Sequence, residues 1–163
     1  MTTHSYWGDV EEDWAGYSSE IYFSHPFFDI PKTEVFLGDE YDEEGEEIET
    51  PPTEKQLTAF AKTYRVFIDN IENNLADLQL KSFERYKRIY AKYYENSEQS
   101  GEPLLNIDSI EKHNAYIKNL MYLRVLDNKT IKVTIRYKLD TEHGIEFKFV
   151  DGQIEAVGGI SET

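Results

Sequence analysis

The chain has 163 residues, no cysteine, and 32 Asp and Glu against 17 Lys and Arg, which gives a formal charge of −15. A surface this negative repels phosphate backbones and anionic lipids, so DNA, RNA and membrane binding are disfavoured. The lack of cysteine excludes a disulfide framework, a thiolate zinc site and a cysteine nucleophile. The first residues lack the features of a signal peptide, and no run reaches the ~18 apolar residues of a membrane span. We therefore expect a cytoplasmic protein with one domain over residues 1–163.

Short aromatic segments and turn formers alternate in the first forty residues. Residues 20–24 and 33–38 are rich in β-branched and aromatic side chains, which predicts two strands. Trp7 and Trp14 are predicted to anchor the core, because an indole buries a large area while its N–H finds a partner.

Residues 39–49 form an acidic run with eight carboxylates and no basic residue. Its members are Asp39, Glu40, Asp42, Glu43, Glu44, Glu46, Glu47 and Glu49. An EF-hand would place a Glu six residues after the glycine, but Pro51 stands there after Gly45, so the calcium pattern fails. Two interpretations remain: a solvated loop with Gly45 at its turn, or a docking surface for a basic protein partner. The second gains weight because concentrating like charges costs folding stability.

A helical region follows the acidic run. Thr53 and Gln56 have the spacing of a capping box, and apolar residues then recur every three or four positions. An unbroken helix from Thr53 to Asn96 would be about 65 Å long, too long for a compact domain of this size. We expect a break between Asn70 and Ser82. The aromatic and basic residues that follow are expected to form a core face rather than a surface for single-stranded nucleic acid.

Apolar and polar residues alternate from residue 131 to residue 157, which predicts an antiparallel meander. Asp151-Gly152 predicts a tight type I′ turn within it. The order of strands, helices and strands predicts an α+β fold: an antiparallel sheet, built from N-terminal strands plus the C-terminal meander, with two or three helices packed mainly on one face.

Asp140, Glu142 and His143 are the best candidates for a reactive cluster, since carboxylates beside a histidine can supply an acid and a base. However, they are adjacent on one loop, where water keeps pKa values ordinary. No catalytic sequence motif is present, and the four histidines lack metal-ligand spacing. The favoured interpretation is structural: Gly144 supplies a positive φ and Asp140 folds back on the N–H groups of the loop. We therefore expect no enzyme activity, no cofactor and no metal; a hydrolase or transferase using these residues is the alternative.

Residues 139–158 (LDTEHGIEFKFVDGQIEAVG) resemble the end of a group of small, uncharacterised bacterial α+β domains. Their last hairpin has the form W-D-x-E-H-G-[LI]-x-[VF], followed by a D-G or N-G turn. Asp140, Glu142, His143 and Gly144 match this form, and Leu139 stands in place of the Trp. The resemblance extends to a Pro-Thr-x-x-Gln helix start and an early Trp-x-Gly, and so covers nearly the whole chain.

Members of this group often occur near secreted polymorphic toxins. The resemblance therefore implies an immunity protein that neutralises a toxin by occlusion, or an accessory of such a locus. The composition agrees with the first reading, because an acidic face suits a basic effector. A self-associating housekeeping domain is a further alternative.

Overall fold

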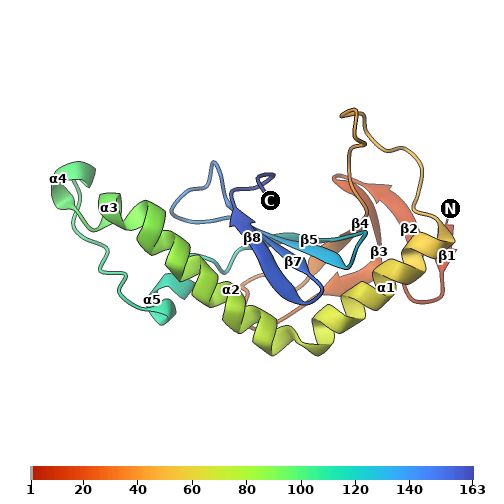
Figure 1. Ribbon diagram of the computed structural model, residues 1–163, viewed down its shortest axis with the longest axis horizontal. Coiled ribbons are helices and arrows are strands. Elements are labelled where there is room, and N and C mark those ends of the chain that lie inside the picture. Colours follow the sequence, from red (N-terminus) through yellow and green to blue (C-terminus); the bar gives the residue numbers. More distant parts are fainter. Residues whose placement is uncertain (1) are drawn as a thin grey trace.

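One eight-stranded sheet, with its strands in chain order, dominates the computed structural model, which describes residues 2–163 (Figure 1). The N-terminal strands are β1 (Thr2–His4), β2 (Gly8–Asp13), β3 (Gly16–Phe23) and β4 (Thr33–Leu37). The C-terminal strands are β5 (Leu120–Leu126), β6 (Thr130–Ile135), β7 (Ile145–Val150) and β8 (Gln153–Gly158). The α+β fold expected from the sequence is therefore confirmed.

The sheet is mostly antiparallel, as predicted, and contains one parallel pair that the sequence did not reveal. β4 and β5 are parallel neighbours, with Val35 opposite Leu123 and Leu37 opposite Val125, whereas every other neighbouring pair is antiparallel. All the helices lie in the chain between these two strands. A helical crossover carries the chain from the end of the sheet where β4 finishes back to the end where β4 began, and two strands joined in this way run parallel.

The helices lie mainly on one face of the sheet, as expected. α1 (Glu54–Asp69) and α2 (Ile71–Arg85) meet at an angle beneath the strands in Figure 1. A π-helical turn, η1 (Tyr86–Tyr90), and α3 (Ala91–Tyr94) continue the line of α2, and the short α4 (Ser97–Ser100) and α5 (Ile110–Asn114) follow. Among residues 2–163, no helix is both long enough and apolar enough to cross a membrane.

The predicted start and break of the helical region are both confirmed. The Thr53 side chain accepts from the Gln56 N–H and the Gln56 side chain accepts from the Thr53 N–H, which completes the capping box. The break falls at Asn70, whose φ of −110° and ψ of 22° leave the helical region. Its side-chain amide donates to the carbonyl of Val66, so the residue ends α1 with its own hydrogen bond.

One tryptophan anchors the core and the other does not. Trp7 is fully buried and its Nε1 donates to the Leu57 carbonyl at 2.9 Å, which ties the β1–β2 connection to α1. The prediction for Trp14 was wrong, because its side chain is 62% exposed in the β2–β3 turn. A residue at the tip of a tight turn projects from the sheet, so it cannot reach the layer between sheet and helices.

The predicted turn between β7 and β8 is confirmed. Asp151 and Gly152 have φ values of 50° and 81°, and Val150 pairs with Gln153 across them. Positive φ at both central residues is what a type I′ turn requires.

His113 is a buried polar residue at the centre of the aromatic packing around α5. Its Nε2 lies 2.6 Å from the Tyr137 hydroxyl, and its Nδ1 is a buried atom without a hydrogen-bond partner in the described chain. The rings of Phe83, Tyr86 and Tyr116 surround it. Burial lowers the pKa of His113 to about 4, so the folded protein keeps this imidazole neutral.

This shift predicts that the fold loses stability as the pH falls. An unfolded histidine binds a proton below about pH 6.5, whereas folded His113 does so only below about 4, so the unfolded state gains protons first. From about pH 7.5 to about pH 5 we expect His113 to account for a loss of about 2 kcal/mol in the free energy of unfolding. Urea unfolding at both pH values should show that His113→Gln reduces this loss.

His143→Gln serves as the matched control, because the exposed His143 has a raised pKa and contributes with the opposite sign. If His113→Gln and the unaltered chain lose the same free energy over this pH range, buried His113 is not the group responsible.

Candidate functional site

The β6–β7 loop around Asp140 is the first of two candidate sites, and many hydrogen bonds hold it. Gly144 has a φ of +62° and its N–H donates to the Asp140 carbonyl at 2.8 Å, as the structural interpretation of the motif requires. A Cβ at residue 144 would lie 3.0 Å from the Ile135 carbonyl oxygen and would collide with the Ile160 side chain. Both the backbone conformation and the lack of space therefore demand glycine at this position.

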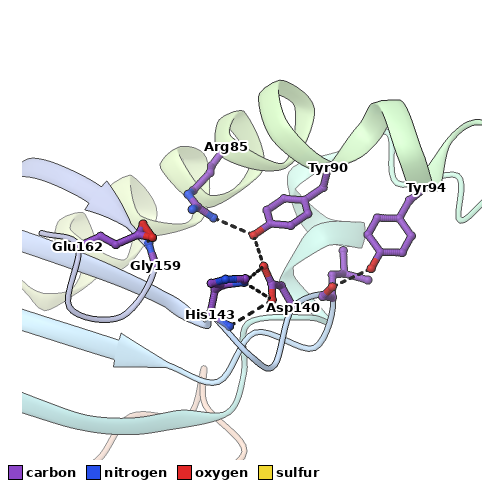
Figure 2. A network of polar contacts seen from close by, with 8 residues as sticks. Arg85, Tyr90, Tyr94, Asp140, His143, Gly159 and Glu162 are labelled. Atoms are coloured by element: carbon purple, nitrogen blue, oxygen red, sulfur yellow. Dashed lines mark hydrogen bonds and ion pairs between the residues drawn. The ribbon is translucent and has the colours of Figure 1, made fainter.

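Asp140 organises this loop through its carboxylate. Oδ1 accepts from the backbone N–H of His143 at 3.2 Å and lies 3.0 Å from His143 Nδ1, while Oδ2 accepts from the Tyr90 hydroxyl at 2.8 Å (Figure 2). Burial by itself would raise the pKa of Asp140, but the hydrogen bonds from Tyr90 and His143 outweigh it and hold the pKa below its usual value. Asp140 is thus a stabilised carboxylate rather than a poised general acid.

The π-helical turn supplies the other half of the network. Tyr90 accepts from the Arg85 guanidinium at 3.2 Å as well as donating to Asp140, and Tyr94 donates to the Leu139 carbonyl at 2.7 Å. Figure 2 shows both tyrosine rings directed from η1 and α3 toward the β6–β7 loop. A π-helical turn shifts the face that later residues present, and such turns are frequent at functional sites.

The C-terminal segment holds the loop from its other side. The Ile160 N–H donates to the His143 carbonyl at 2.7 Å, and Glu162 accepts from the Gly159 N–H at 2.8 Å. Beyond these, the Thr163 hydroxyl bonds the buried carboxylate of Glu146. The loop is therefore fixed between the helices and the end of the chain.

Only two of the three candidate reactive residues meet. Glu142 is exposed and forms none of the hydrogen bonds or ion pairs found among residues 2–163. The carboxylate of Asp140 raises the pKa of the exposed His143, so that imidazole is charged over a wider pH range. The pair stabilises the fold most where both are ionised: the contribution of His143 is lost as the pH rises through its folded pKa, and that of Asp140 as the pH falls through its own.

The acidic run forms the second candidate site, a loop that extends away from the sheet between β4 and α1 (orange in Figure 1). Asp42 Oδ1 accepts from the backbone N–H groups of Glu44 and Glu46, both at 2.9 Å, and Gly45 turns the chain with a φ of +81°. Tyr41 and Glu47 form a bridge across the turn. The loop is hence a small hairpin whose carboxylates project outward from a fixed backbone.

Three of these carboxylates lie close enough to share a cation. The oxygens of Asp42, Glu44 and Glu46 fall within 4.8 Å of one another, and all three residues are exposed. Carboxylate oxygens suit a hard cation such as Ca²⁺. Exposed acidic groups also gather without any metal, and Asp42 already uses one oxygen to hold the turn, so the cluster does not define a metal site.

Exposed aromatic side chains border the acidic loop. Tyr41 is 56% exposed within the loop, and the 62%-exposed Trp14 lies in the β2–β3 turn, which is linked to Gly38 at the start of the loop. Arg124 joins the two segments, because its guanidinium donates to the carbonyls of Gly38 at 2.9 Å and Ala15 at 2.7 Å. The Trp14 Nε1 donates to Glu34 at 2.9 Å, which holds the exposed indole in place.

Sequence reasoning missed Trp14 and Arg124 as parts of this surface. The turn residue Gly16, two positions after Trp14, was the signal that this tryptophan could not be in the core. Nothing in the pattern marked Arg124, since its partners are backbone carbonyls 86 and 109 residues away in the chain.

The fold and the two sites define a small acidic α+β domain. Its β6–β7 loop is fixed by hydrogen bonds, and its acidic hairpin has exposed aromatic side chains nearby. The chain belongs to the family DUF6985, described as a domain of unknown function, whose model matches residues 6–162. This supports the coarser part of the resemblance seen in the sequence, a domain family of unknown function over nearly the whole chain. No curated protein and no solved structure matches the chain.

The Tyr90 network predicts a graded series of hydroxyl deletions. Tyr90→Phe removes the hydrogen bond of the 8%-exposed Arg85 guanidinium and leaves Asp140 with His143 alone, so we expect the free energy of unfolding to fall by about 1–3 kcal/mol. Tyr94→Phe removes one hydrogen bond to a carbonyl and should cost about 0.5–1.5 kcal/mol. Tyr93→Phe, on a half-exposed ring of the same helix, is the control and should change stability by less than about 0.5 kcal/mol. Denaturant unfolding of the three variants measures this order; equal stability of Tyr90→Phe and Tyr93→Phe would contradict it.

Proposed function

We propose that this chain binds and neutralises a basic protein, of the toxin-domain class, through the acidic hairpin and the aromatic side chains beside it. The observation that carries the proposal is the juxtaposition of eight carboxylates, on a backbone fixed by Asp42, with Trp14 and Tyr41, which are 62% and 56% exposed. Charge and exposed aromatic area are the two components from which protein interfaces are built.

The charge supplies long-range attraction. Seven of the eight carboxylates are exposed, the exception being the half-buried Glu40, and none forms an ion pair among residues 2–163. An unneutralised patch of this kind accelerates encounter with a basic partner and disfavours acidic ones. The patch is also pre-ordered, which lowers the entropic cost of binding.

The aromatic residues supply short-range contact. Trp14 packs edge-on against Phe36 and Tyr122 on one side and presents its other side to solvent. Tryptophan and tyrosine are enriched among residues that dominate binding energy, since they bury much area with few rotatable bonds. A tryptophan held by Glu34 and exposed beside a charged loop fits this role.

Three further features support a neutralising role. The chain is small and strongly acidic. Its terminal motif resembles that of domains found near secreted toxins. The polar cluster around Asp140 makes its hydrogen bonds within the protein. Occlusion of a basic effector in the cytoplasm needs a binding face and no active site of its own. The proposal accordingly assigns no catalytic residue and no cofactor.

Neutralising the hairpin tests the role of the charge. Glu43, Glu44, Glu46 and Glu47 are replaced by Gln, while Asp42 is kept because it holds the turn. The binding partner for this test is the toxin domain that the proposal expects to be encoded next to this chain, at the C-terminus of a secreted protein. We expect the association rate constant to fall about tenfold or more at about 50 mM salt, and its salt dependence to weaken.

The matched control removes four acidic charges elsewhere: Asp77→Asn with Glu98→Gln, Glu102→Gln and Glu111→Gln, all at exposed positions. This variant should keep most of the association rate. If both variants associate equally fast, or if the hairpin variant is unchanged, the acidic hairpin is not the docking surface.

Truncating the aromatic anchor tests the short-range contact. Trp14→Ala should raise the dissociation rate constant and weaken binding by about 2 kcal/mol or more, with little effect on the association rate. Tyr93→Ala removes a similarly exposed ring from α3, remote in sequence from the hairpin, and should leave binding unchanged. Surface-immobilised binding kinetics separate the two rate constants, and circular dichroism verifies that each variant is folded.

A further inference from the structure

A cavity of about 300 Å³ lies between α1 and the turns that join β5 to β6 and β7 to β8. Its walls include the apolar side chains of Val66, Phe67, Leu126, Ile131 and Phe149. The volume is at the lower end of the range for small-molecule sites and would hold about ten water molecules. A largely apolar cavity with a few polar groups is the usual form of such a site.

The opening of the cavity is built from two short turns. The Asp151 N–H donates to the Lys129 carbonyl at 3.0 Å, which joins one turn to the other. Asn128, Lys129, Asp151 and Gly152 all have positive φ values, between 50° and 81°. The two hairpin ends therefore form a fixed rim, and the cavity is formed before any ligand binds.

Lys129 is in a conformation that its residue type disfavours. It closes a three-residue hairpin connection with a φ of 57°, the position at which glycine is preferred because a Cβ is strained there. The β7–β8 turn has glycine at its corresponding last position. A residue held in a conformation that glycine would adopt without strain suggests a functional constraint, and Lys129 is one of the residues that line the cavity.

A second lysine lines the cavity from the helix side. Lys62 is exposed on α1 and forms none of the ion pairs among residues 2–163. It also borders a neighbouring hollow lined by Lys55 and Arg65, so this side of α1 is rich in cations within a chain of charge −15.

Two carboxylates also line the cavity. Asp151 lies 3.8 Å from the Lys129 ammonium, and both side chains are at least 70% exposed, so the pair is weak and leaves Lys129 able to bind another anion. Asp127, in the same turn as Lys129, is the second.

We propose that this cavity binds a small amphiphile with an apolar body and one anionic head, of the size of a medium-chain carboxylate. The apolar body fills the space over Phe67, Ile131 and Phe149, and the head lies at the opening between the Lys62 and Lys129 ammonium groups. The site adjoins the acidic hairpin, because Asp127 lines both this cavity and the hollow that contains Asp39. It uses other residues and does not depend on the function proposed for the hairpin.

Octanoate is the probe, with octanol and octylammonium as neutral and cationic analogues of equal length. Titration into ¹⁵N-labelled full-length chain should move the amide signals of α1, the β5–β6 turn and the β7–β8 turn, with a dissociation constant on the order of 0.1–1 mM. Octanol should bind about threefold to tenfold more weakly, and octylammonium more weakly still.

Two variants separate binding from stability. Lys129→Gly relieves the backbone strain, so the melting temperature should stay the same or rise by about 2–4 °C, while octanoate binding weakens about threefold to tenfold. Lys62→Gln should weaken binding to a similar degree, whereas Lys92→Gln, the same charge change on α3, should not. Asp151→Asn frees Lys129 and keeps a residue that tolerates positive φ, so octanoate should bind at least as tightly as to the unaltered chain.

Three results would overturn the proposal. One is the lack of signal changes around the cavity, or changes spread over the whole surface, with octanoate. Another is binding of octylammonium as tight as that of octanoate. The third is unchanged octanoate affinity in both Lys62→Gln and Lys129→Gly.

Discussion

The parallel pairing of β4 with β5 is the constraint on which the arrangement of this protein depends. It joins the N-terminal hairpins to the C-terminal meander and places every helix in the connection between the two strands. Neighbouring parallel strands have their C-terminal ends on the same side of the sheet. The acidic hairpin, which follows β4, and the Asp127–Lys129 turn, which follows β5, are therefore neighbours, and Asp39, Ile48 and Asp127 line one hollow. In contrast, the loop of Asp140 follows β6, which is antiparallel to β5, and therefore lies at the opposite end of the strands.

This geometry separates a hydrogen-bonded end of the sheet from an end that carries unpaired charge. At one end, Asp140, Tyr90 and the C-terminal segment are joined to the loop by hydrogen bonds. At the other end, the carboxylates of the hairpin and the ammonium of Lys62 form no ion pair among residues 2–163. Unpaired charge and exposed aromatic area cost stability, so a fold can keep them only where other contacts compensate for that cost.

The sequence predicted features whose causes are local. The capping box of Thr53 and Gln56, the break at Asn70 and the Asp151-Gly152 turn each depend on residues within a few positions of one another. The parallel β4–β5 pair could not be predicted in this way, because its partners are almost ninety residues apart. The contacts of Tyr90 with Asp140 and of Arg124 with Ala15 could not be predicted either. The pattern of residues along one segment carries no information on which distant segment it will contact. Strands β1 and β2 were missed because polar and acidic residues leave little apolar alternation in them.

Trp14 shows how a wrong prediction can redirect the interpretation of a surface. Its size suggested a core position, but the turn at Gly16 forces it outward, and there it packs on Phe36 while Glu34 fixes its indole N–H. Arg124 then holds this turn against the base of the acidic hairpin. The acidic hairpin thus has a rigid apolar group near its base, the Trp14 side chain, which was predicted from the sequence to lie in the core. This neighbour supports the proposed docking role over a purely solubilising one, because charge brings a partner close and buried aromatic area retains it.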